Sequence, residues 1–94
     1  MKRASKRIRE WRRRHAYARC ACRLPQCWGE ATEPHHRLAR SVGGGDEDAN
    51  LVPVCRACHV RYHEVCGQHR PTQAQRECWL KIGPELMLPE VKDD

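Results

Sequence analysis

The sequence predicts a small α+β domain that a bound metal holds together. Three features indicate this class: a chain of 94 residues without phenylalanine, two closely spaced pairs of cysteines, and one segment rich in histidine. Chains near this length bury only a modest apolar core, so they often need a metal or disulfides for stability. Charge and motifs divide the single domain into a basic segment (1–19), a core (20–67) and a C-terminal segment (68–94).

The basic segment is predicted to form an amphipathic helix that binds nucleic acid. Residues 1–19 contain nine Lys and Arg and one acid, whereas residues 20–94 contain nine Lys and Arg and eleven acids. Four residues recur at helical spacing and form a stripe that can dock on the core, which predicts a helix over 5–18. The arginines on its other faces can follow a phosphate backbone. The alternative is a solvated tail, or one that binds RNA, a membrane surface or an acidic protein. The stripe consists of Ala4, Ile8, Trp11 and His15, and the candidate nucleic-acid contacts are Arg3, Lys6, Arg7, Arg12, Arg13 and Arg14.

The cysteine spacing predicts a structural zinc site. Cys22 and Cys27 enclose a four-residue turn, and two residues separate Cys55 from Cys58. Two such short-spaced pairs are typical of zinc held tetrahedrally by four thiolates. Cys20 is the alternative to Cys22, although we consider it the weaker partner for Cys27. Disulfides are the competing explanation for these cysteines.

The cellular compartment favours the metal over the disulfides. The first residues, MKRASKRIREWRRR, contain no apolar stretch of the kind that a secretory signal needs. No segment is long and apolar enough to span a membrane. We therefore expect a reducing, cytoplasmic location.

The histidine-rich segment predicts two strands followed by a helix. A short strand over 32–38 carries the adjacent His35 and His36, a glycine-rich acidic loop follows, and a second strand covers 51–54. Pro53 keeps this second strand short or at an edge, because proline donates no ladder hydrogen bond. After Cys55 a helix is expected to run to about Cys66, with Gly67 as its C-terminal stop.

A second helix is predicted in the C-terminal segment. Thr72 and Gln75 have the spacing of a capping box, and Gly83-Pro84 ends a helix of about ten residues. Residues 85–94 are expected to be loosely attached. The face of this helix that should pack on the preceding one comprises Ala74, Cys78 and Ile82, with Trp79 beside them and Val60 or Val65 as their contacts.

The segment from Pro34 to Glu64 resembles the HNH nuclease motif. The resemblance covers residues 22–63: Cys-x4-Cys, a histidine pair, a glycine-rich acidic loop, Asn-Leu-Val, and Cys-x2-Cys-His-x3-His. It implies the ββα-metal fold of small phage and bacterial HNH endonucleases, stapled by zinc on four cysteines. By this resemblance a catalytic divalent ion (Mg²⁺, Mn²⁺, Ni²⁺ or Zn²⁺) is bound by His35, His59 and His63, His36 is the general base, and Asn50 braces the His36 backbone.

The chemistry of these residue types agrees with the resemblance. Adjacent strand residues point to opposite faces, so His35 and His36 are expected to have different tasks. Histidine can deprotonate water near neutral pH, and a cation stabilises charge on the phosphate and the leaving oxygen. His59 and His63, four residues apart, project from one face of the helix. Arg37 and Arg40 are candidates to hold the scissile strand.

The sequence therefore predicts a metal-dependent DNA endonuclease that acts on duplex DNA as a monomer or weak dimer. Phage packaging proteins are candidate partners by analogy with small free-standing members of the family, and the expected cytoplasm would be that of the host if a phage encodes the chain. The alternative is a non-catalytic, zinc-stapled nucleic-acid-binding module. In that reading the basic segment is the binder, and the histidines are surface residues or zinc ligands.

Overall fold

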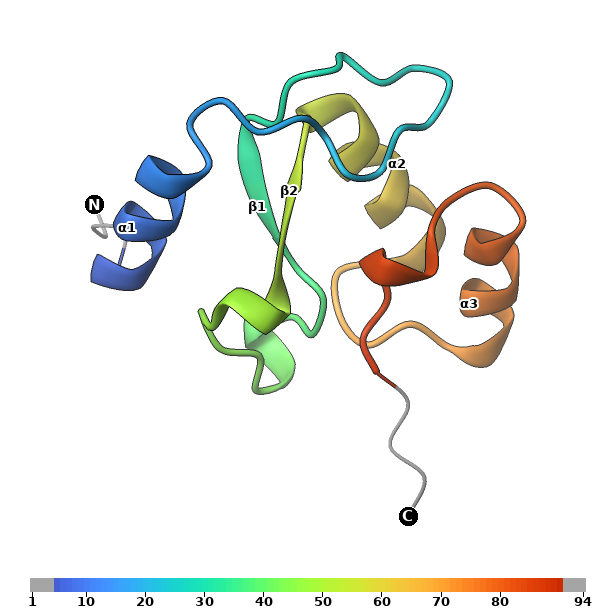
Figure 1. Cartoon of the computed structure of the whole chain (residues 1–94). Helices are drawn as coiled ribbons and strands as arrows, with labels where there is room; N and C mark the ends of the chain where they lie inside the picture. Colours follow the sequence, from blue (N-terminus) through green and yellow to red (C-terminus); the bar gives the residue numbers. More distant parts are fainter. Residues whose placement is uncertain (1–4, 91–94) are drawn as a thin grey trace.

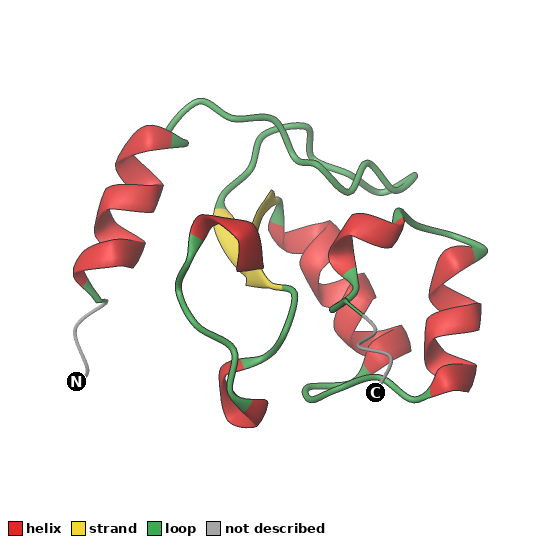
Figure 2. Ribbon diagram, turned by 60° about the horizontal axis from the view of Figure 1, so that its bottom comes forward, coloured by secondary structure: helices red, strands yellow, loops and turns green. Residues whose placement is uncertain are grey.

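The computed structural model describes residues 5–90 and is centred on a two-stranded antiparallel hairpin. Strand β1 (Glu33–His36) pairs with β2 (Leu51–Val54), and helix α2 (Arg56–Cys66) begins directly after β2. Helix α1 (Lys6–Arg14) lies on one side of the hairpin, and α3 (Gln73–Leu80) lies beside α2 on the other (Figures 1 and 2). Short 3-10 turns at Arg40–Val42, Asp48–Asn50 and Glu85–Met87 complete the elements. The small α+β class is confirmed.

Helix α1 is docked through Ile8 and Trp11 of the predicted stripe but is shorter than predicted; Ala4 lies outside the described residues. Ser5 caps the first turn of the helix by accepting the N–H of Ile8 at 3.1 Å, and Ile8 and Trp11 are buried against Leu51. The helix ends at Arg14, not Ala18. Two nitrogens of His15, the backbone N–H and ring Nδ1, converge on the carbonyl of Trp11, and the chain then turns towards the cysteine-rich segment.

Strand β1 is also shorter than predicted, whereas β2 and α2 have the predicted bounds. After His36 the Arg37 N–H donates to the carbonyl of Asn50 at 2.8 Å, and the chain leaves the ladder there. In β2, Pro53 lies opposite Pro34, so two residues that lack a donor face each other. Helix α2 stops at Gly67, whose φ of 75° is one that glycine adopts without strain.

The C-terminal segment differs from the prediction. The capping box of Thr72 and Gln75 is present, and α3 contacts α2, but the face that packs is the one with Trp79. Residues 85–88 fold back over that face, where the indole N–H donates to the carbonyl of Pro84 at 2.8 Å. The predicted face is therefore wrong: Ala74, Cys78 and Ile82 are exposed, as is Val60.

The expectation of a loose C-terminal end is wrong for residues 85–88, because Met87 and Leu88 are fully buried in the main core. That core also contains Val54, Tyr62 and Trp79. Residues 91–94 lie outside the described part of the chain. Among residues 5–90, no helix has the length and apolar character needed to cross a membrane.

Candidate active site

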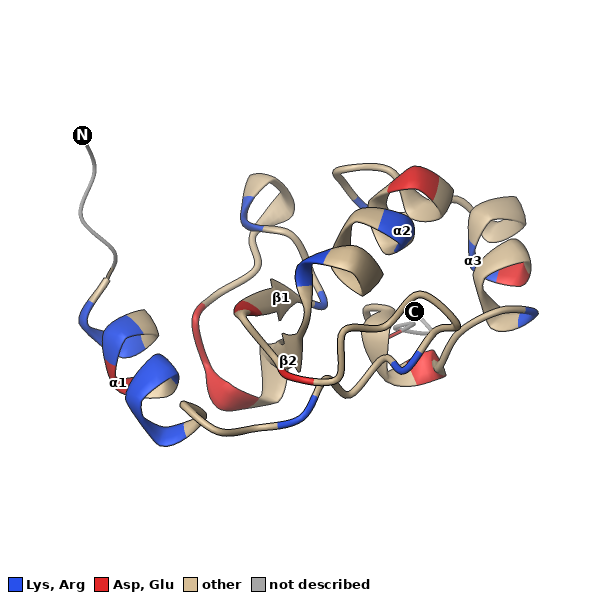
Figure 3. Ribbon diagram, turned by 90° about the horizontal axis from the view of Figure 1, so that it is seen from above, with Lys and Arg blue, Asp and Glu red and all other residues tan. Residues whose placement is uncertain are grey.

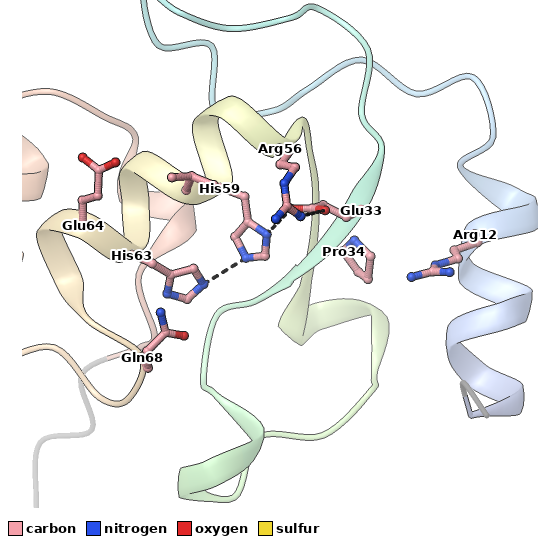
Figure 4. A pocket seen from close by; sticks show the side chains of 9 residues that line it. Arg12, Glu33, Pro34, Arg56, His59, His63, Glu64 and Gln68 are labelled. Atoms are coloured by element: carbon pink, nitrogen blue, oxygen red, sulfur yellow. Dashed lines mark hydrogen bonds and ion pairs between the residues drawn. The ribbon is translucent and has the colours of Figure 1, made fainter. Parts of the chain in front are cut away.

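Three histidines from β1 and α2 meet at one point. His35 projects from β1, and His59 and His63 project from one face of α2. One ring nitrogen from each lies within 4.8 Å of the other two. Figure 4 shows the rings of His59 and His63 turned towards each other, with Glu33 beside them. The predicted grouping of these side chains is therefore present.

One nitrogen of each imidazole ring makes a hydrogen bond that orients the ring. Nε2 of His35 donates to the carbonyl of Met87 at 2.7 Å, and Nδ1 of His63 donates to the carbonyl of Gly67 at 2.8 Å. Nδ1 of His59 donates to the carboxylate of Glu33 at 2.6 Å. Because carbonyls and carboxylates only accept, these contacts assign the proton to that nitrogen in each ring.

The opposite nitrogens then carry lone pairs. Nε2 of His59 and Nε2 of His63 are 3.0 Å apart, too close for two lone pairs without a shared cation or proton. Nδ1 of His35 is fully buried and has no hydrogen-bond partner among the described residues. A buried ring nitrogen without a partner costs free energy unless something else satisfies it. These three nitrogens therefore fit a divalent cation, with the second nitrogens oriented as metal-binding histidines usually are.

Burial favours the neutral form of the His35 and His59 rings. It lowers the pKa of His35 to about 3, although the hydrogen bond to Met87 acts the other way. Burial also lowers the pKa of His59, against the effect of the Glu33 carboxylate. Since only a neutral imidazole offers a lone pair, this environment favours metal ligation over protonation.

The next residue on the strand, His36, faces the other way. Its Nε2 contacts Oδ1 of Asp46 at 2.8 Å. Asp46 also accepts from Ser5 at 2.8 Å and from the guanidinium of Arg40 at 2.8 and 2.9 Å. The hydrogen bonds from His36 and then Arg40 hold the pKa of Asp46 well below its usual range, so this carboxylate is charged. Asp46 was not predicted from the sequence, where the signal for it is limited to its being an acid in the glycine-rich loop.

Asn50 clamps the loop rather than the backbone of His36. Its Oδ1 accepts the Leu38 N–H at 2.8 Å, and its Nδ2 donates to the carbonyls of Leu38 and Gly45 at 3.0 and 2.9 Å. The register explains this correction. His36 lies opposite Leu51, so Asn50 lies one position beyond it, where β1 has already ended. Asn50 thus joins both ends of the loop that carries Asp46.

Four cysteines form a second group, and Cys20 takes the place for which sequence analysis preferred Cys22. The thiols of Cys20, Cys27, Cys55 and Cys58 all lie within 4.8 Å of one another. An antiparallel bridge between Arg19 and Glu30 and a 2.9 Å hydrogen bond from the Cys20 N–H to Gly29 set the chain path. That path brings Cys20 alongside the Cys27 turn. Cys22 is buried close by, and burial raises its pKa to about 12, which keeps it a thiol.

The surroundings of the four thiols fit a structural metal. The N–H groups of Trp28 and Cys58 each point at the Cys55 sulfur at 3.4 Å. Burial opposes ionisation there, but these and neighbouring hydrogen bonds lower the pKa of Cys55 to about 7. Burial raises the pKa of Cys27 and Cys58. A cation at the centre is therefore what would keep all four as thiolates.

The predicted nucleic-acid contacts fall into two sets. Figure 3 shows Lys and Arg concentrated along α1. Arg37 and Arg40, in contrast, have partners within the chain: Arg37 donates to the carbonyl of Leu88 at 3.0 Å, and Arg40 pairs with Asp46. Arg3 lies outside the described residues. The predicted contacts that are exposed on α1 are Lys6, Arg7, Arg12, Arg13 and Arg14, the last paired with Asp48 at 2.8 Å.

An open cleft connects α1 with the histidines. Arg12 lines it on the α1 side, and Arg56, His59 and His63 line it on the α2 side, with Glu33 between them (Figure 4). A polyanion that contacts α1 can therefore also reach the open side of the three-histidine group.

A two-stranded hairpin followed by a helix, with three histidine nitrogens gathered on one face, a further histidine on the other and a group of four cysteines, is consistent with the ββα-metal class of fold. The family model described as HNH endonuclease matches residues 19–65, half of the chain, and the chain belongs to that family. It is thus a phosphodiester hydrolase of a family that binds nucleic acid and uses a divalent metal. No curated protein and no solved structure matched the chain.

Proposed function

We propose that this protein is a DNA endonuclease in which His35, His59 and His63 hold one divalent cation and His36 activates water. The observation that carries the proposal is the gathering of one ring nitrogen from each histidine, with a buried Nδ1 of His35 that has no hydrogen-bond partner among residues 5–90. When bound, the cation supplies positive charge where negative charge develops on the phosphate and the leaving oxygen.

Two features of His36 support its proposed role as general base. It follows His35 on the strand and points to the other face, so it does not compete for the cation. Arg40 Nε also points at Nε2 of His36 at 3.3 Å, but a charged carboxylate only accepts, so we assign the His36 proton to the shorter contact with Asp46; this leaves the lone pair on Nδ1 to accept a proton from water. Asp46 stabilises the imidazolium that forms, and Asn50 keeps the Asp46 loop in place.

The four-cysteine group is proposed to hold zinc in a structural role. Tetrahedral sites of four thiolates strongly favour this ion, and such a closed set leaves no position for substrate. The site joins the segment before β1 to the start of α2, so it fixes the helix that carries two of the catalytic-site histidines.

A plasmid-nicking assay tests the proposed activity. Purified protein is incubated with supercoiled plasmid and with Mg²⁺, Mn²⁺, Ni²⁺ or Zn²⁺ in turn. We expect at least one ion to produce relaxed circles, because one site cuts one strand at a time. The cut strand should carry a 3′-hydroxyl end. If the protein binds DNA but nicks it with none of the four ions, it is instead a non-catalytic binding module.

Substituting Arg7, Arg12 and Arg13 with alanine tests the role of α1. These exposed side chains can be removed without touching the buried Ile8 and Trp11. If all three contact phosphates, the slope of log affinity against log salt should shrink by roughly three units, at about 0.9 per contact.

The matched control for this measurement is Lys81→Ala, which removes one exposed charge at the far end of α3. We expect it to leave the salt slope unchanged. A triple variant with the wild-type slope would mean that α1 does not contact the DNA backbone.

A further inference from the structure

The protein presents one tryptophan on its surface. Trp28 is 63% exposed, whereas Trp11 and Trp79 are 3% and 0% exposed. Trp28 follows Cys27 in the turn that carries part of the cysteine group. Its own N–H is directed at the Cys55 sulfur at 3.4 Å, and the N–H of Gly29 is directed at the Cys27 sulfur at 3.3 Å. These contacts fix the backbone of the turn from which the indole projects.

Trp28 lines a hollow that adjoins the catalytic cleft. Ala57 and Arg61 of α2 line the same hollow. Arg56 and Val60 line both this hollow and the cleft that contains His59. In Figure 4, Arg56 lies next to His59, at the edge of the cleft. A groove thus leads from the three-histidine group over Arg56 to the indole.

The charges along this groove suit a nucleic-acid strand. Arg12 stands on the α1 side of the cleft, and Arg56 and Arg61 are exposed on α2. Two acids also line this groove, and each is paired with one of these arginines: Glu64 with Arg61 at 3.1 Å, and Glu33 with Arg56 at 3.7 Å. Cations that follow a backbone, combined with an exposed aromatic ring, are the features by which proteins bind unpaired strands.

We propose that Trp28 stacks on an unpaired nucleobase of the strand that occupies this groove. The inference rests on the proposed function, in which the strand crosses the three-histidine group. Bases inside an intact duplex already stack on each other, so their faces are closed to the indole. The protein should therefore favour DNA that has unpaired bases beside the position it cuts.

Tryptophan fluorescence tests this contact directly. All proteins carry His36→Ala so that the DNA stays intact, and each is titrated with a single-stranded oligonucleotide and with the corresponding duplex. The single strand should quench emission of the parent, because its exposed indole is Trp28. Trp28→Phe should abolish the quenching, since the remaining tryptophans are buried, while the phenyl ring still permits binding.

Affinity gives the second measurement. Trp28→Ala should weaken binding of the single strand by about 5- to 150-fold, the range measured for loss of one base–aromatic stack, and should weaken duplex binding by less than about 2-fold. The matched control is Tyr17→Ala, which removes an aromatic ring that is 98% exposed and lies outside the groove. It should bind as the parent does.

Three results would overturn the proposal. If the parent binds DNA but neither quenching nor affinity depends on Trp28, the indole lies off the path of the strand. If emission shifts to the blue as protein concentration rises without DNA, a second copy covers Trp28. If no protein binds DNA at all, the proposed function falls together with this inference. If Trp28→Ala fails to fold, the difference in fluorescence quenching between the parent and Trp28→Phe still tests the proposal.

Discussion

Replacing Cys20 with alanine is expected to release the structural metal and unfold the domain. Cys20 is one of four thiols that lie within 4.8 Å of one another. Structural zinc contributes on the order of 10 kcal/mol of folding free energy in small domains, which is as large as the whole stability of many of them. The measurement is metal content per chain, together with circular dichroism of the purified variant.

Cys22→Ala is the matched control, because Cys22 is also buried and lies two residues away. It should lose at most a few kcal/mol, as small core substitutions do, and should keep about one zinc per chain. The opposite pattern, with zinc lost from Cys22→Ala and kept in Cys20→Ala, would reinstate Cys22 as the ligand. A folded, metal-free wild type with disulfides would rule out the zinc site.

Local patterns predicted the elements that carry the chemistry. The bounds of β2 and α2 follow from Pro53, Cys55 and Gly67, residues whose backbone preferences act within a few positions. The alternation of a strand placed His35 and His36 on opposite faces for the same reason. Such features depend on the nearest neighbours in the chain, so one sequence is enough to identify them.

Features that depend on distant contacts were missed. Cys20 was ranked below Cys22 because the choice depends on how the chain pairs Arg19 with Glu30, which spacing alone does not reveal. The carbonyl that orients His35 belongs to Met87, 52 residues further along the chain. Nothing in a short acidic tail indicates that it returns to the core.

The loop residue Asp46 was missed for a related reason. A glycine-rich segment suggests flexibility when it is read alone, but here Asn50 clamps both of its ends and Ser5 of α1 anchors the carboxylate. The loop is therefore positioned by contacts from outside itself. Its acid reaches His36 only because of that support.

Replacing His36 with alanine is expected to lower the cleavage rate by about 10²-fold or more, the usual effect of losing a general base. The fold, both metals and the affinity for DNA should persist, because His36 belongs to neither ligand group. His59→Ala should instead weaken the catalytic metal while the zinc on the four cysteines remains. The measurements are plasmid cleavage rates as a function of added Mg²⁺ or Mn²⁺, with metal content determined in parallel.

The dependence on added metal separates the two roles. Excess Mg²⁺ or Mn²⁺ should partly restore His59→Ala, since mass action can compensate for a lost ligand. It should not restore His36→Ala, because a cation cannot accept a proton. His69→Ala, which removes an exposed histidine bonded to Ser41 at 2.8 Å, is the control and should cleave as the wild type does. Full activity in His36→Ala would exclude it as the base, and loss of zinc with unfolding in both variants would make the histidines structural.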